Sequence, residues 1–274
     1  YTASRNPPKL KVHTALAHLA RIAGARARCK GPHAMSDSLD QLCNDYHVNM
    51  RLNLKMDLPT GRDTVLSLFD RLRKDFGAMD RFRKLTSELV LESEPSPQGQ
   101  FWTSLRKNSL RSGVMNPPSP KDAYKLHKLL LQTAPNYLSI SPLDIDYLEL
   151  MFGFDLLATG NHDAIVFDAL IAGSPLAAML DVQGGVPVDC QPLFVMAVDD
   201  TLEVHAQFEV KTRTHSHHPK HADMPPAPIS VYLTMRRYGP VDDVAQLAAL
   251  LDTLGQHGEK LVMNKVVPNL LVPI

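Results

Sequence analysis

The segment from His47 to Leu58 constrains the fold more than any other part of the sequence, because apolar and polar residues alternate along it almost without a break. Successive side chains of a strand point to opposite faces of a sheet, so a period of two predicts a strand with one buried and one wet face. Pro59 ends this strand. The expected buried face comprises Val48, Met50, Leu52, Leu54, Met56 and Leu58, and the expected wet face Asn49, Arg51, Asn53, Lys55 and Asp57.

A helix and a second alternating segment follow this strand. Thr60-Gly61-Arg62-Asp63 resembles a capping box and predicts a helix through about Phe76. Residues 84–92 alternate again and predict a strand with Leu85, Ser87, Leu89 and Leu91 on one side. Strand, helix and strand in this order suggest a crossover unit, with antiparallel placement as the open alternative. A short strand over 101–107 would carry Trp102, the single tryptophan.

The central part of the chain has repeated helix-start chemistry. Ser119-Pro120 and Ser141-Pro142 each place a serine before a proline, with an acid in the first turn, and Ser174-Pro175 repeats the pair. Helices are therefore predicted over about 120–133, 142–158 and 162–172. The middle one is apolar almost all round and should be buried, with Ile145, Leu148, Leu150, Met151, Phe152, Phe154, Leu156 and Leu157.

The last third of the chain returns to the period of a strand. Residues 193–198 form an apolar run, Asp199-Asp200 reads as a tight turn, and residues 201–214 and 229–238 alternate. These features predict a three-stranded antiparallel meander covered by a helix that begins at Pro240. The predicted fold class is α+β, and no internal sequence repeat is visible.

Charge separates the beginning of the chain from the rest. Residues 1–36 carry seven basic side chains and no acid, whereas the remainder has 22 basic against 29 acidic residues. We therefore expect a basic N-terminal extension, helical over 9–30, followed by an α+β body over 37–274. The body allows sub-units at 37–95 (strand, helix and strand), 119–182 (helical) and 191–274 (meander and helix).

The amino-acid composition indicates in which cellular compartment the protein resides. Cys29, Cys43 and Cys190 are odd in number and form no C-x-x-C pair, which argues against a disulfide framework and a thiolate zinc site. No apolar run is long enough to span a bilayer, so a soluble protein is expected. The arginine-rich, acid-free start also matches the composition of organelle transit peptides. The expected location is the mitochondrial matrix or another reducing intracellular compartment.

Motifs of common enzymes are missing from the sequence. It contains no phosphate loop, no dinucleotide fingerprint, no H-E-x-x-H and no G-x-S-x-G. These absences favour a non-catalytic protein without a cofactor, although sites are recognised by geometry rather than spacing alone.

Two groups of residues could still carry chemistry. The tract with His215, His217, His218 and His221 could bind a metal, but its four prolines favour a solvated connection, and no metal site is predicted. Asn161-His162-Asp163 could be catalytic together with Asp144 and Asp155. Helix capping by Asn161 is the favoured explanation of that motif. Asp144, Asp146 and Glu149 could likewise form a divalent-ion site, or simply the wet edge of a helix start.

Two functional hypotheses follow, one for a non-catalytic protein and one for an enzyme. The first is a non-catalytic structural or assembly subunit of a larger complex, such as a mitochondrial ribonucleoprotein, that contacts other protein subunits. Its basic extension would contact RNA phosphates through Lys9, Lys11, Arg21, Arg26, Arg28 and Lys30. The alternative is an enzyme of unrecognised type, with a site near His162, Asp163 and the acids between 144 and 155.

Overall fold

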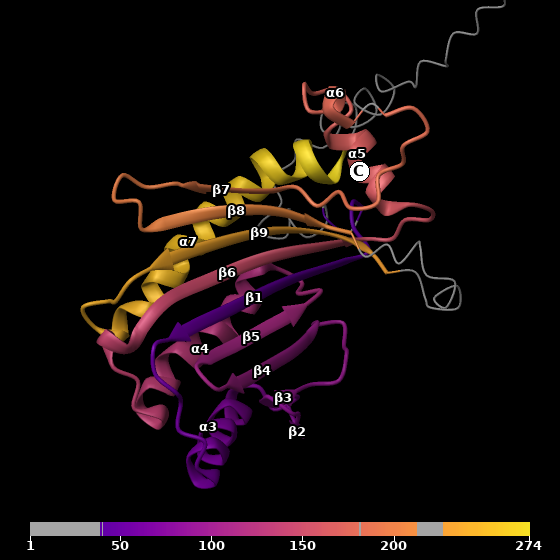
Figure 1. Ribbon diagram of the computed structural model, residues 1–274. Coiled ribbons are helices and arrows are strands. Elements are labelled where there is room, and N and C mark those ends of the chain that lie inside the picture. The colour runs from indigo at the N-terminus through magenta and orange to yellow at the C-terminus, as the bar shows by residue number, and fades with distance from the viewer. Residues whose placement is uncertain (1–38, 40, 181, 213–226) are drawn as a thin grey trace, which may run out of the picture. The chain divides into compact units, whose positions relative to one another are not determined.

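The protein is described by a computed structural model that covers residue 39 and residues 41–180, 182–212 and 227–274. An antiparallel sheet of nine strands dominates this part of the chain (Figure 1), in the order β2-β3-β4-β5-β1-β6-β9-β8-β7. The α+β class is therefore confirmed. The strands are β1 (Asp45–Leu54), β2 (Arg81–Lys84), β3 (Glu88–Glu92), β4 (Gln100–Arg106), β5 (Ser109–Met115), β6 (Ile145–Leu156), β7 (Leu193–Ala197), β8 (Val204–Lys211) and β9 (Ile229–Tyr238).

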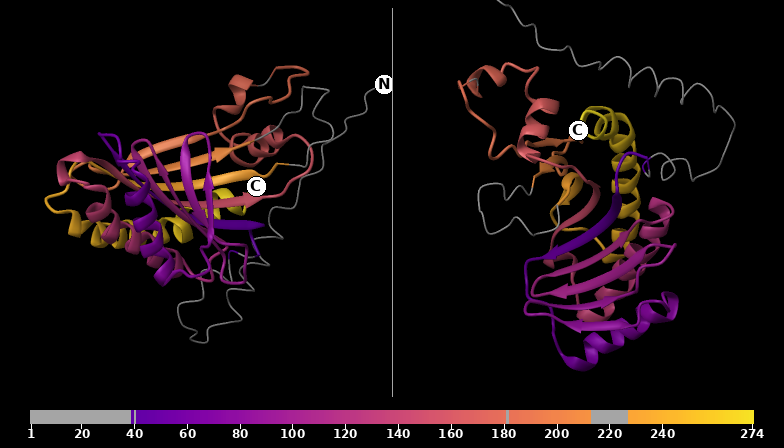
Figure 2. Two further views of the ribbon diagram at one scale, coloured as in Figure 1. Left: turned by 90° about the horizontal axis from the view of Figure 1, so that it is seen from below. Right: turned by 90° about the vertical axis from the view of Figure 1, so that its right-hand side faces the viewer.

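Helices α3 (Arg62–Asp75), α4 (Pro120–Leu138) and α7 (Leu247–Leu261) lie on one face of the sheet (Figures 1 and 2). The chain continues from α7 as a π-type helix over Val262–Leu271. Two short helices, α5 (His162–Leu170) and α6 (Ala177–Leu180), follow β6 in the sequence. None of the described helices is long and apolar enough to cross a membrane.

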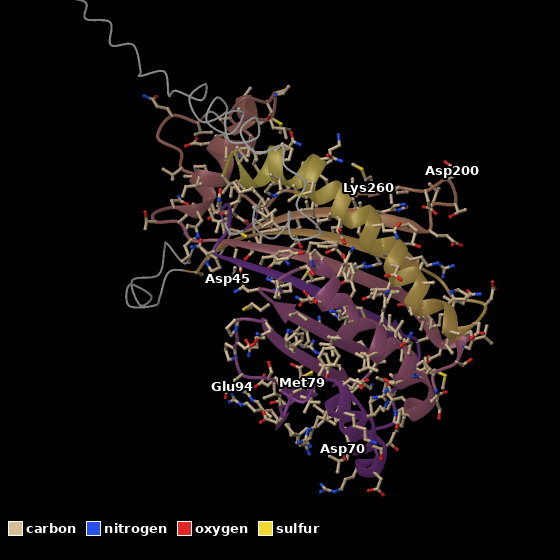
Figure 3. The ribbon with its side chains drawn as sticks, turned by 180° about the vertical axis from the view of Figure 1, so that it is seen from behind. Asp45, Asp70, Met79, Glu94, Asp200 and Lys260 are labelled. Atoms are coloured by element: carbon tan, nitrogen blue, oxygen red, sulfur yellow. The ribbon has the colours of Figure 1, made fainter. Side chains whose placement is uncertain are left out.

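The core lies between the sheet and these three helices. Strand β1 contributes Val48, Met50 and Leu52, all essentially unexposed, as the alternation predicts. The strand ends at Leu54 and not before Pro59, so the prediction that Met56 is buried is wrong, and this side chain is exposed. Each faces an apolar partner on β6, since Val48 pairs with Phe152, Met50 with Leu150 and Leu52 with Leu148. Figure 3 shows this side of the molecule, with α7, marked by Lys260, lying across the strands and α3, marked by Asp70, at the opposite end of the sheet. Helix α4 contacts both of them. The helices add Val65, Leu68, Leu126, Leu130, Leu251 and Leu254.

The order of the strands divides the sheet into two halves of similar topology. In each half a central strand, β1 or β6, leads to a helical segment and then to a meander whose last strand returns beside the first. Helix α4 follows the first meander and helix α7 the second. The sequence shows no repeat, so this duplication becomes visible only through strand order.

Several predicted elements are confirmed. Helix α3 buries Val65, Leu68, Phe69 and Leu72, although Gly61 is its N-cap and no side chain caps it, so the predicted capping box is wrong. Helix α4 begins after Ser119 as predicted and extends to Leu138. The predicted meander forms as β7, β8 and β9, and α7 contacts β9 and β6. The predicted helix over 9–30 lies outside the described residues.

The predicted helix over 142–158 is wrong. A single 3-10 turn covers Pro142–Asp144, and strand β6 runs over Ile145–Leu156 at the centre of the sheet. Alternate side chains from Leu148 to Phe154 are buried, whereas Tyr147, Glu149 and Met151 are half-buried on the other face. Because that second face also carries Met151 and an aromatic ring, the segment looks apolar all round, and periodicity alone does not distinguish a central strand from a buried helix.

The region from 81 to 92 also differs from the prediction. A turn after Lys84 divides it into β2 and β3, where one strand over 84–92 was expected, and Leu85 is exposed. Strands β4 and β5 lie between β3 and β1, and all pairs are antiparallel. The crossover interpretation is therefore wrong, and its antiparallel alternative holds.

Candidate functional site

Two of the predicted functional segments lie outside the described residues. These are the basic extension, with Lys9, Lys11, Arg21, Arg26, Arg28 and Lys30, and the histidine tract, with His215, His217, His218 and His221. Both stay predictions. Within the described ranges, no group of three or more His, Cys, Asp or Glu residues is arranged to hold a metal ion.

The motif at Asn161 is a helix start, as favoured from the sequence. The Asn161 side chain accepts hydrogen bonds from the amides of Asp163 (3.0 Å) and Ala164 (3.2 Å). Asp163 is 2% exposed, and its Oδ1 accepts from the Cys190 amide and the Thr212 hydroxyl. His162 Nε2 lies 3.0 Å from the Ala158 carbonyl oxygen. The buried carboxylate thus joins α5 to the loop before β7 and to the end of β8.

The acids between 144 and 155 have separate structural partners. Asp144 Oδ1 accepts from the Met56 amide, and Asp146 Oδ2 accepts from the Asn53 side chain. Asp155 accepts a hydrogen bond from Ser230, and Glu149 pairs with Arg236. These bonds tie β6 and the turn before it to neighbouring segments, so they do not favour the enzyme alternative.

The sheet face opposite α3, α4 and α7 carries a row of charged side chains. Arg111 on β5 stands directly opposite Arg51 on β1, which stands opposite Glu149 on β6, and Glu149 in turn faces Arg236 on β9. We call Arg111, Arg51, Glu149 and Arg236 the charged row. All four side chains are half-buried. Figure 1 views this face, with β5, β1, β6 and β9 side by side.

Aromatic rings pack around one end of the charged row. The Arg236 guanidinium lies 4.6 Å from the Tyr147 ring centroid, and its Nη1 donates to the Tyr238 hydroxyl at 2.8 Å. Arg236 Nε also donates to Glu149 at 2.9 Å. These contacts hold Arg236 in place and occupy the Glu149 carboxylate.

At the other end of the charged row, Arg51 and Arg111 have fewer hydrogen-bond and ion-pair partners. Arg51 Nη2 donates to Asn53 Oδ1 at 2.8 Å, but Arg51 Nε is buried without a hydrogen-bond partner. Among the described residues, Arg111 forms neither an ion pair nor a side-chain hydrogen bond. Burial lowers the pKa of Arg111, and the positive charges of Arg106 and Arg51 lower it further. Next to Arg111, the Trp102 indole lies across Gly113, where a Cβ would come within 2.4 Å of the ring.

A groove of about 510 Å³ lies where the start of α3 meets the β2–β3 turn. Its floor is apolar, with Leu58, Val65, Leu89 and Leu105 among the lining residues. Arg62, Lys84, Arg106, Lys107 and Glu88 also line it.

The two edge strands of the sheet differ in how well they are protected against pairing with another strand. Edge strand β2 carries Arg81, Arg83 and Lys84 around a single apolar residue, Phe82. Edge strand β7 has the sequence Leu-Phe-Val-Met-Ala without a charge, and all five residues are exposed. The exposed fractions of its four large side chains, Leu193 to Met196, lie between 51% and 59%. Natural sheets usually protect such edges with charge, proline or a covering segment.

Sequence reasoning missed the charged row and the β7 edge for different reasons. The alternation predicts Arg51 on the wet face, but its neighbours Arg111 and Glu149 follow only from the pairing of β1 with β5 and β6. The apolar run at 193–198 predicts a strand, and only strand order shows that this strand lies at an edge. The sequence matches no known protein-family model, and no curated protein is significantly similar to it.

Proposed function

We propose that this protein is a non-catalytic assembly subunit that joins a second copy of itself through β7. Within the described part of the chain, no strand pairs with the outer edge of β7, and this open edge is the observation that carries the proposal. An edge strand presents a row of backbone donors and acceptors, which another strand can satisfy by adding to the sheet.

The composition of β7 favours a second copy as the occupant. Two such strands pairing antiparallel about a twofold axis at Val195 would place Leu193 opposite Ala197 and Phe194 opposite Met196. Every cross-strand pair would then be apolar, with no like charges opposed. Phe194 against Met196 would add a favourable contact between sulfur and aromatic ring. The same pairing at β2 would bring Arg81, Arg83 and Lys84 of both copies together, which opposes it.

The test measures molecular mass in solution. By analytical ultracentrifugation over a range of concentrations, the unaltered chain should be a dimer that dissociates on dilution. Val195→Lys should be a monomer with an unchanged circular dichroism spectrum. Leu143→Lys, at a residue 76% exposed elsewhere on the surface, is the matched control and should dimerise normally. A chain that is monomeric at every concentration would contradict pairing between copies and leave a strand of another protein as the occupant.

The proposal extends to RNA through the basic extension. Its seven cations and absence of acids suit phosphate contacts, whose affinity falls steeply with salt. Deleting residues 1–30, or changing Arg21, Arg26 and Arg28 to Glu, should weaken RNA binding in low salt and reduce its salt dependence. Equal RNA binding by the complete and truncated chains would contradict this part. A mitochondrial ribonucleoprotein remains the proposed setting, because of the transit-like composition.

A further inference from the structure

We propose that the sheet face opposite the helices binds a phosphate group between Arg51 and Arg111. Neither arginine belongs to β7 or to the basic extension. The site consists of two neighbouring strands at the centre of the sheet, so the backbone that positions it is rigid.

The first argument is the unfavourable placement of two like charges. Arg51 and Arg111 are direct cross-strand partners on β1 and β5. Side chains in such a position have Cβ atoms about 4.5–5.5 Å apart, and like charges there destabilise the sheet. A polar residue at either position would fill the surface without this cost, so an anion that lies between the guanidinium groups would relieve a strain that the free protein carries.

The second argument is that the nearby carboxylates already have other hydrogen-bond partners. Glu149 is held by Arg236, and Glu88 accepts from Arg106 through both carboxylate oxygens, at 3.0 and 3.4 Å. Asp146 accepts from the Asn53 amide. No described carboxylate lies within ion-pair distance of Arg51 or Arg111, although the charges of Glu88 and Glu149 act on Arg111 from farther away. Arg51 Nη2 donates to Asn53, but both guanidinium groups keep further N–H donors that no described carboxylate accepts.

The third argument is the match of these donors to phosphate. A guanidinium presents planar paired donors, and two of them can hold several oxygens of one tetrahedral anion. Arg51 Nε has no hydrogen-bond partner and is buried, so an anion would reach it only after the side chain turned towards solvent. The Tyr147 ring centroid lies 5.5 Å from the Arg51 guanidinium, and Trp102 lies diagonally across from Arg111. These rings would flank the phosphate of a nucleotide and allow its base to stack.

Thermal unfolding of the complete chain tests the proposal, with inorganic phosphate and an eight-nucleotide RNA as separate probes at constant ionic strength. Phosphate stabilises most proteins because it is excluded from their surface. The readout is therefore the difference between the rise in melting temperature of the unaltered chain and that of each variant. The melting temperature of the unaltered chain should rise with probe concentration. Arg51→Gln and Arg111→Gln should each remove the larger part of that rise. The matched control Arg83→Gln, an exposed arginine of β2 paired with Glu92, should retain all of it.

A second readout is independent of ligand. Without phosphate, Arg111→Gln should melt no lower than the unaltered chain, because it removes a like-charge contact. Stabilisation by inorganic phosphate would support a general phosphate site, and stabilisation by RNA alone a site for nucleic-acid phosphates. A rise of equal size in all four proteins, no rise with either probe, or a lower melting point of ligand-free Arg111→Gln would each overturn the proposal. All four proteins keep β7 and residues 1–36, so this outcome is independent of the proposed dimer and of the basic extension.

Discussion

The imidazole Nδ1 of His127 on α4 lies 2.8 Å from the hydroxyl of Ser112 on β5, and neither side chain is exposed to solvent. The pair is a buried polar contact between α4 and the sheet. Burial lowers the pKa of His127 to about 3, so the imidazole is neutral in the folded protein at neutral pH.

This depressed pKa predicts loss of stability in mild acid. The unfolded chain takes up a proton at His127 with a pKa of about 6.5, whereas the folded chain does not. Stability should therefore fall as the pH drops from about 6.5 towards 3, by up to ~1.4 kcal/mol per pH unit from this residue. Urea titrations at several pH values would measure it, and His127→Gln should show a shallower decline. The same slope in both proteins would contradict the buried neutral imidazole.

Gly258 on α7 packs directly against the sheet. A Cβ there would lie 2.3 Å from the Phe152 ring and 3.2 Å from Met235 Cγ. Alanine favours a helix over glycine by about 1 kcal/mol, but overpacking a core costs ~1–3 kcal/mol. We expect Gly258→Ala to destabilise the protein in urea unfolding, whereas Gln256→Ala, on the exposed side of α7, should be neutral or stabilising. Stabilisation by both changes would refute the close contact.

Local pattern was sufficient for several elements. The alternation in β1 predicts its buried face because one side of this strand packs on helices, while the other carries polar side chains that are only partly exposed. Helix α3, β8 and β9 are predicted for the same reason, because each has one apolar face and its period is visible in the sequence. Strand β7 is instead predicted from a continuous apolar run.

Contacts between distant segments were not predictable in this way. Glu149 and Arg236 are 87 residues apart and meet only because β6 pairs with β9. Arg51 and Arg111 likewise require β5 to return beside β1. Predicting β6 as a helix removed the central strand from the sheet, and with it the charged row. No local pattern encodes strand order, so neither this row nor the unprotected edge of β7 could be located from the sequence.

Strand β6 can be tested by substitutions on its two faces. Leu150 is fully buried against the helices, whereas its neighbour Met151 lies on the opposite face and is half-buried. We expect Leu150→Ala to cost ~2–5 kcal/mol and Met151→Ala clearly less. Phe152→Ala should again be severe, at ~3–5 kcal/mol, so that the effect alternates along the segment. Urea unfolding would show it, and equally large losses at all three positions would instead support a helix buried on every side.

The hydrogen bond between Thr212 and Asp163 predicts a structural role for a carboxylate that could be taken for a catalytic one. Asp163 accepts from the Thr212 hydroxyl at the end of β8 and from the Cys190 amide at 2.9 Å, and it is 2% exposed. Asp163→Ala leaves both donors unpaired and should cost ~1–3 kcal/mol of unfolding free energy. Thr212→Val removes one of the two bonds, so the double-mutant cycle should give a coupling of ~0.5–3 kcal/mol. Asp168→Ala, at an exposed position of the same helix, is the control and should be nearly neutral. A stable Asp163→Ala protein with no coupling to Thr212 would remove the structural explanation and return Asp163 to the candidates for catalysis.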